Sequence, residues 1–114
     1  MRDYKLYLDD MLEAINRIEK YSKGMTLKRL KTDTLVLDGI VRNLEIIGEG
    51  AKNIPSQIKE KHLEIEWKKI AGLRDILAHE YFGIDLEVVW DIVKNKLPIF
   101  KSQVDRILNK KNNR

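Results

Sequence analysis

The apolar residues of this chain recur at helical spacing almost from end to end, and this pattern limits what it can fold into. They step by three and four through residues 4–18, and again through residues 27–51, 67–77 and 86–107. No stretch alternates apolar and polar residues, and Asp38-Gly39, a pair that often forms hairpin turns, is flanked by helical spacing on both sides. The sequence therefore predicts an all-α protein.

Capping residues mark the expected ends of the first two helices. Asp3 should cap the first helix and Gly24 should end it. Thr26 should cap a second helix that continues for about seven turns, until Asn53-Ile54-Pro55 breaks it. Because this second helix carries two apolar stripes, we expect it at the centre of the fold with neighbours on more than one side.

Two further long helices complete the predicted fold. A short helical turn is expected within residues 56–64, and a third helix should begin near Trp67 and end at Gly83. Asp85 should cap a fourth helix. Pro98 lies inside the apolar stripe of this helix and should kink it, because proline donates no N–H and crowds the preceding turn.

These elements predict an antiparallel four-helix bundle with a short extra helix, which forms one domain over residues 1–114. From about residue 109 the chain becomes a basic tail that should fray.

Charge and composition exclude several classes of function. The formal net charge is +4, and residues 101–114 alone hold five basic residues against one acidic residue, so residues 1–100 sum to zero. General nucleic-acid affinity is therefore not predicted from charge, and RNA binding would need a local cluster. The chain has no cysteine, no apolar run of membrane-spanning length and no secretory leader pattern. We expect a cytoplasmic protein that does not associate with membranes.

The segment "RDILAHEY", residues 74–81, is the first candidate site. Arg74 could bind a phosphate, His79 could move a proton near neutral pH, and the Tyr81 hydroxyl could be modified. The alternative is structural: a surface arginine, a histidine favoured near a helix C-terminus, and a half-buried tyrosine.

Helical geometry complicates a site made from one copy of this segment. Arg74 and Tyr81 would lie about 20° apart around the helix, whereas His79 would lie about 140° from Arg74. Either the helix loosens after Ala78, or two copies of the segment meet across a dimer axis.

The second candidate is "RNLEIIGEGAKNIP", residues 42–55. Its charged residues could form a ladder of ion pairs along a solvated edge. Alternatively, Arg42 or Glu49 faces the helix of Arg74 and supports it. Gly48 and Gly50 cost helix stability, and close approach of another helix would explain them.

The other polar residues suggest no further site. His62 has no partner at ligand spacing and is expected at the surface, and the acidic residues Asp9, Asp10 and Glu13 are expected on a solvated face. No phosphate-loop, dinucleotide or metal-binding motif is present, so the sequence predicts neither a metal nor a cofactor.

Taken together, these segments resemble the HepT-like branch of the HEPN superfamily. "RDILAHEY" matches the R-x4-H-x-Y motif of that branch. "RNLEIIGEGAKNIP", "WKKIAGLRDILAHEYFGIDLEVVW" and the Leu97-Pro98 pair are similar to it in order and spacing. The resemblance covers nearly the whole chain and leaves no motif residue missing.

The resemblance implies a homodimer with the motif helices at its interface. It implies a metal-independent endoribonuclease that acts on RNA as the toxin of a toxin–antitoxin pair. Arg74 and His79 would be the catalytic pair, and Asp75 would fill the polar position after the arginine. The partner would be a minimal nucleotidyltransferase antitoxin, which would transfer AMP to Tyr81. The alternative is a non-catalytic subunit that binds a nucleotide or docks on a nucleotidyltransferase.

Overall fold

The computed structural model describes residues 3–79 and 85–112, and the side-chain surroundings of residues 3–74 and 85–109. Regular structure in the described residues is helical throughout. The longer helices are α1 (Tyr4–Ser22), α3 (Thr34–Lys52), α5 (Trp67–His79) and α7 (Leu97–Asn112). The shorter ones are α2 (Leu27–Leu30), α4 (Ser56–Lys61), α6 (Leu86–Asp91) and the π-helical turn η2 (Ile92–Lys96). The predicted all-α class is confirmed.

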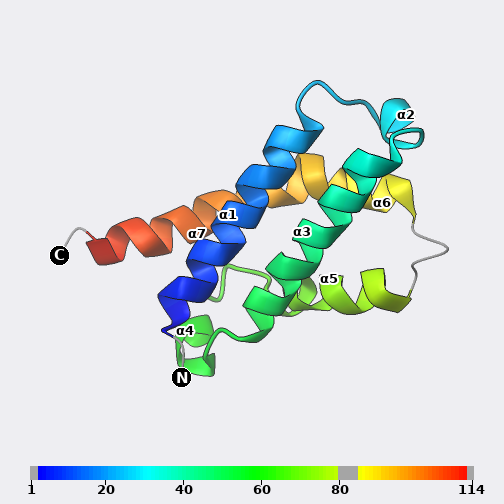
Figure 1. Ribbon diagram of the computed structural model, residues 1–114. Helices are drawn as coiled ribbons and strands as arrows, with labels where there is room; N and C mark the ends of the chain where they lie inside the picture. Colours follow the sequence, from blue (N-terminus) through cyan, green and yellow to red (C-terminus); the bar gives the residue numbers. More distant parts are fainter. Residues whose placement is uncertain (1–2, 80–84, 113–114) are drawn as a thin grey trace.

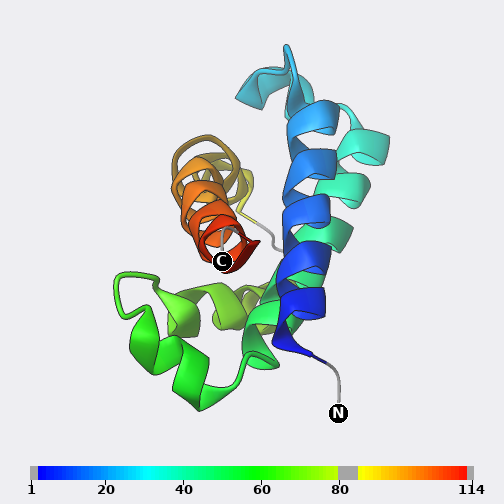
Figure 2. The ribbon, with the colours of Figure 1, turned by 90° about the vertical axis from the view of Figure 1, so that its left-hand side faces the viewer.

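The helices form two layers. α1 and α3 lie side by side and antiparallel (Figure 1). α5 and the continuous segment from α6 to α7 cover one face of this pair and cross it, as the perpendicular view shows (Figure 2). α3 therefore has neighbours on two sides, α1 and α5, as its two apolar stripes predicted.

Three predicted caps are confirmed. The Asp3 side chain accepts a hydrogen bond from the backbone N–H of Lys5, and Gly24 follows α1 with a φ of 74°, which suits glycine. The Asp85 carboxylate accepts from the N–H groups of Glu87 and Val88 at the start of α6.

The prediction of one unbroken helix from Thr26 to about residue 52 is wrong. Thr26 caps only the single turn of α2, and α3 begins separately at Thr34. Asp33 separates the two helices, because its side chain accepts a hydrogen bond from the Val36 N–H at 3.1 Å and caps α3.

Pro98 is accommodated by a change of helix type. The π-helical turn η2 lies directly before it, and the N–H of Leu97 donates to the carbonyl of Ile92, five residues back. Such a wider turn is one of the recognised ways in which a helix absorbs an interruption of its hydrogen-bond ladder. The chain thus meets Pro98 with a π turn, and the expected kink stays a prediction. α7 continues to Asn112, and fraying of the tail stays a prediction.

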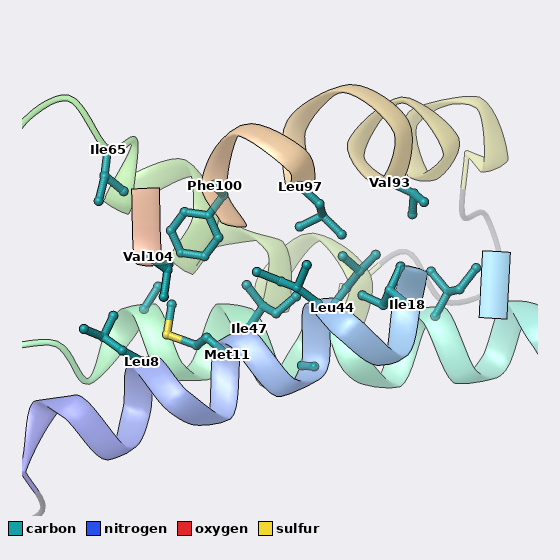
Figure 3. Close-up of a cluster of buried hydrophobic side chains, with 14 of the residues drawn as sticks. Leu8, Met11, Ile18, Leu44, Ile47, Ile65, Val93, Leu97, Phe100 and Val104 are labelled. Carbon is teal, nitrogen blue, oxygen red and sulfur yellow. The ribbon is translucent and has the colours of Figure 1, made fainter. Parts of the chain in front are cut away.

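The core lies between the two layers. Figure 3 shows side chains of α1, α3, η2 and α7 meeting there. Trp67 ties the start of α5 to this core: its ring lies edge-on to Phe100, with centroids 6.3 Å apart, and its indole N–H donates to the His62 carbonyl. The fully buried large side chains are Leu8, Met11, Ile15, Ile18, Leu30, Ile40, Leu44, Ile47 and Val104.

Candidate functional site

The position of α5 is set by a glycine on α3. A Cβ atom on Gly48 would lie 2.9 Å from the backbone nitrogen of Arg74 and 3.3 Å from the carbonyl oxygen of Ile70. Real Cβ atoms essentially never lie so close to backbone, so any other residue at position 48 would force α5 away from α3. The close helix approach predicted for Gly48 is confirmed, and it occurs at Arg74.

Gly50 also permits a close approach, but to a different helix. A Cβ atom there would overlap the Cγ and Sδ atoms of Met11 on α1. Gly48 and Gly50 therefore face the two neighbours of α3, and together they allow α1 and α5 to pack closely against it.

Arg74 is paired across the α3–α5 contact. Its Nε lies 3.2 Å from Oε2 of Glu49, the residue after Gly48. The Arg74 side chain is 48% exposed and that of Glu49 51% exposed, so the pair lies at the surface. An arginine has five N–H donors, and the Nη groups extend beyond the nitrogen that faces Glu49.

The alternative of an ion-pair ladder along α3 is not found in the described part of the chain. No ion pair there joins Arg42, Glu45, Glu49 and Lys52 to one another, and the Arg42 side chain is exposed. The structure thus brings Glu49 against Arg74. The role of either residue in a reaction stays a prediction.

The other motif residues are only partly described. α5 is helical through His79, so Asp75 and His79 continue the helix of Arg74, but their side-chain surroundings lie outside the described residues. The positions of Arg74 and His79 thus keep the helical offset of about 140°. Tyr81 and the predicted helix end at Gly83 lie outside the described residues altogether.

α5 borders an apolar groove on the side that faces α7. The groove has a volume of about 490 Å³, and its walls include Ile70 and Leu73 of α5 and Ile99 and Phe100 of α7. Ile99 is 60% exposed, and it lies on the wall of this groove. The sequence analysis did not single out Ile99, because it falls outside the buried stripe of α7.

Charges of both signs lie on the rim of this groove. Lys69 Nζ lies 2.9 Å from Oε2 of Glu66, and this contact lowers the pKa of the Glu66 carboxyl and raises that of the Lys69 ammonium. Lys96, on the opposite wall, also lowers the pKa of Glu66, by its charge and to a smaller extent.

His62 is less exposed than predicted. Its side chain is 23% exposed, and its Nδ1 lies 3.9 Å from Oε2 of Glu64. Among the described residues, no group of three or more His, Asp or Glu side chains is arranged to hold a metal ion. None of the described helices combines the length and hydropathy of a membrane span.

Comparison with known proteins assigns the family. The family model described as "Ribonuclease HepT-like" matches residues 11–107, which is most of the chain. The chain belongs to the HepT-like ribonuclease family. The resemblance seen in the sequence motifs is thereby confirmed, and Arg74 and His79 both fall within the matched residues of this HepT-like chain.

Several relatives of this HepT-like chain carry ribonuclease names. A "probable ribonuclease HepT" of Thermococcus cleftensis is 40% identical over 93% of this chain and 96% of its own length. A "putative RNase" of Caldanaerobacter subterraneus subsp. tengcongensis is 37% identical over 96% of this chain and 98% of its own.

A third relative is longer. It is named "Gamma-glutamylcyclotransferase and putative RNase", comes from Methanocaldococcus jannaschii, and is 41% identical over 94% of this chain. The HepT-like chain spans 48% of that protein's length. No solved structure matches the chain.

Proposed function

We propose that this protein is a metal-independent endoribonuclease and the toxin of a toxin–antitoxin pair. One observation carries the proposal: α5 crosses α3 at Gly48 in such a way that Arg74 is held by Glu49 at the surface, on the helix that also contains His79. An arginine held at a fixed and accessible point suits the recognition of a phosphodiester. The family assignment supplies the class of reaction.

The proposed reaction uses the RNA's own nucleophile. A ribose 2′-oxygen attacks the adjacent phosphorus as it loses its proton, and the bond to the 5′-oxygen of the next nucleotide breaks. The products are a 2′,3′-cyclic phosphate and a 5′-hydroxyl. His79 moves the proton, a role worth about 10²- to 10⁴-fold in rate, and Arg74 stabilises the charge that develops on the phosphoryl oxygens.

We further propose that the site is completed by a second copy of the chain. The offset of about 140° between the positions of Arg74 and His79 prevents one straight helix from directing both at one phosphate. A two-fold axis beside α5 would bring two such pairs to one cleft. The groove between α5 and α7 supports this arrangement, because it is apolar and its rim carries charges of both signs, as a self-complementary surface needs.

The catalytic assignment is tested by two substitutions. Arg74→Ala and His79→Ala should each reduce cleavage of single-stranded RNA by at least about 100-fold and abolish growth inhibition. The fold should persist, because the half-exposed Arg74–Glu49 pair contributes at most about 1 kcal/mol to stability. Cleavage should also survive EDTA. The measurements are product analysis on gels, growth after induction, and thermal melting.

A matched control is available for the arginine. Arg17 forms a similar exposed ion pair with Glu13 at 2.7 Å on α1, so Arg17→Ala removes the same chemistry at another place. It should leave cleavage unchanged. Full activity of Arg74→Ala or His79→Ala would refute the assignment, and a strict Mg²⁺ requirement would refute the acid–base mechanism. Absence of cleavage by the wild type would favour a docking subunit without catalysis.

Regulation is proposed to act through Tyr81. A partner nucleotidyltransferase would transfer AMP from ATP to the Tyr81 oxygen and release pyrophosphate, which would add a negative phosphate beside the motif and repel RNA. Tyr81→Phe should therefore retain at least part of the cleavage activity and resist neutralisation. The test incubates both proteins with the partner enzyme, ATP and Mg²⁺ and measures their masses. A wild type without added AMP, or AMP on another tyrosine, would refute this part alone.

A further inference from the structure

The ion pair between Glu49 and Arg74 lies at the point where α5 packs most closely against Gly48 of α3, although an exposed ion pair needs no such packing. Exposed ion pairs contribute little to stability. Yet Gly48, next to Glu49, sits where a Cβ would collide with the backbone of Arg74. The helix crossing thus brings this one carboxylate to this one guanidinium, with 3.2 Å between Oε2 and Nε.

Glu49 lies beside Nε of Arg74, and this position sets the orientation of the guanidinium. The group is planar, so a carboxylate at Nε limits rotation of the plane and sets the direction of the Nη donors. A side chain that is 48% exposed would otherwise sample several rotamers. Fixing it in advance lowers the entropy lost when a phosphate binds.

The charge of Glu49 has a second consequence. A phosphate bound to the same guanidinium would lie within a few ångströms of the carboxylate, and two negative charges at such a distance repel even in water. Glu49 therefore weakens the binding of RNA in the ground state while it holds Arg74 in place.

We infer that Glu49 is a positioning residue for the proposed ribonuclease reaction, which orients Arg74 through Nε and lowers its affinity for RNA. The inference rests on the proposed function. It predicts that changes at Glu49 alter KM as well as kcat, whereas a loss of folded protein would lower the apparent kcat and leave KM unchanged.

Two variants separate the two effects. Glu49→Gln keeps the size of the side chain beside Nε but loses the charge, so KM for a fluorescein-labelled single-stranded RNA of mixed sequence should fall about fivefold and kcat should change by less than about threefold. Glu49→Ala loses both the charge and the side chain that contacts Arg74, so kcat should fall about tenfold as well. Thermal melting should show both variants folded.

Salt dependence distinguishes the charge from the orientation. Between about 0.1 M and about 1 M salt the Debye length falls from about 10 Å to about 3 Å, so the KM advantage of Glu49→Gln should shrink, whereas the kcat loss of Glu49→Ala should remain. The matched control is Glu13→Gln, which neutralises the carboxylate of the other exposed Glu–Arg pair and should change neither constant.

A measurement without catalysis keeps the two proposals apart. The ¹⁵Nε–¹Hε NMR signal of Arg74, identified by its loss in Arg74→Lys, should shift in Glu49→Ala and stay in place in Glu13→Gln. A wild type that cuts no RNA defeats the proposed function whatever this signal does. The inference is overturned if the wild type cuts RNA while Glu49→Gln and Glu49→Ala match Glu13→Gln, or if the signal does not respond to Glu49.

Discussion

At the scale of single residues, glycine determines where the helices meet. The sequence predicted close packing at Gly48 and Gly50, because glycine is costly inside a helix and needs a reason. It could not predict which helix each one meets. Gly48 faces α5 and Gly50 faces Met11 of α1, and that depends on how three helices cross in space.

Alanine at Gly48 should be destabilising although it favours the helix. The gain in helix propensity is about 1 kcal/mol. The new Cβ would lie 2.9 Å from the Arg74 nitrogen, and forcing two backbones apart costs about 1–3 kcal/mol. We expect Gly48→Ala to lower the free energy of unfolding by about 1 kcal/mol in urea titrations, and to reduce cleavage because Arg74 moves.

Gly72 provides the matched control in the facing helix. A Cβ there would meet nothing within 4 Å, so Gly72→Ala should raise the free energy of unfolding by about 0.5–1 kcal/mol. If the two alanine variants changed stability in the same direction, the close contact at Gly48 would not be what sets the position of α5.

The angles of residues around α3 could not show whether Arg42 or Glu49 contacts Arg74. Arg42 and Glu49 are seven residues apart and share one face of α3, so the sequence could not choose between them. They lie about 10 Å apart along the helix axis. Because α5 crosses α3 at Gly48, the residue that lies next to Arg74 is Glu49.

At the scale of elements, the break between α2 and α3 could not be seen in the apolar spacing, because that spacing continues across it. Leu27, Leu30, Thr34 and Leu37 keep helical spacing across the interruption. The available signal was the run Thr32-Asp33-Thr34, whose side chains compete for backbone hydrogen bonds. The capping residue Asp33 therefore determines where α3 begins, although the apolar spacing continues across it.

Removal of this cap should destabilise α3 from its first turn. Asp33→Ala loses the acceptor for the Val36 N–H and should lower the free energy of unfolding by about 1 kcal/mol in urea titrations. Asp33→Asn retains an oxygen at the same place and should lose less than half of that. Equal stability of the alanine variant and the wild type would mean that packing alone starts α3.

At the scale of the whole molecule, the fold class followed from periodicity, but the groove between α5 and α7 did not. Apolar spacing indicates which residues of one helix share a face, and it carries no information on how far apart two helices lie. This groove lies beside α5, and the exposed Ile99 lies on its wall. The net charge of residues 1–100 is zero, so general attraction to RNA cannot assemble the site.

A charge introduced into the groove should therefore both separate the two copies of the chain and stop RNA cleavage. Ile99→Glu would place a carboxylate in the apolar part of the proposed interface, and we expect the dissociation constant to rise at least about 100-fold, equivalent to about 2.7 kcal/mol. Light scattering should then show monomers, and RNA cleavage should fall in proportion to the dimer that remains. The control is Leu35→Glu, which changes a side chain that is 82% exposed on the first turn of α3 and should leave both measurements unchanged. A monomeric wild type that cleaves RNA, or a fully active monomeric Ile99→Glu, would show that one copy of α5 is enough, and the offset between Arg74 and His79 would then have to be resolved within a single chain.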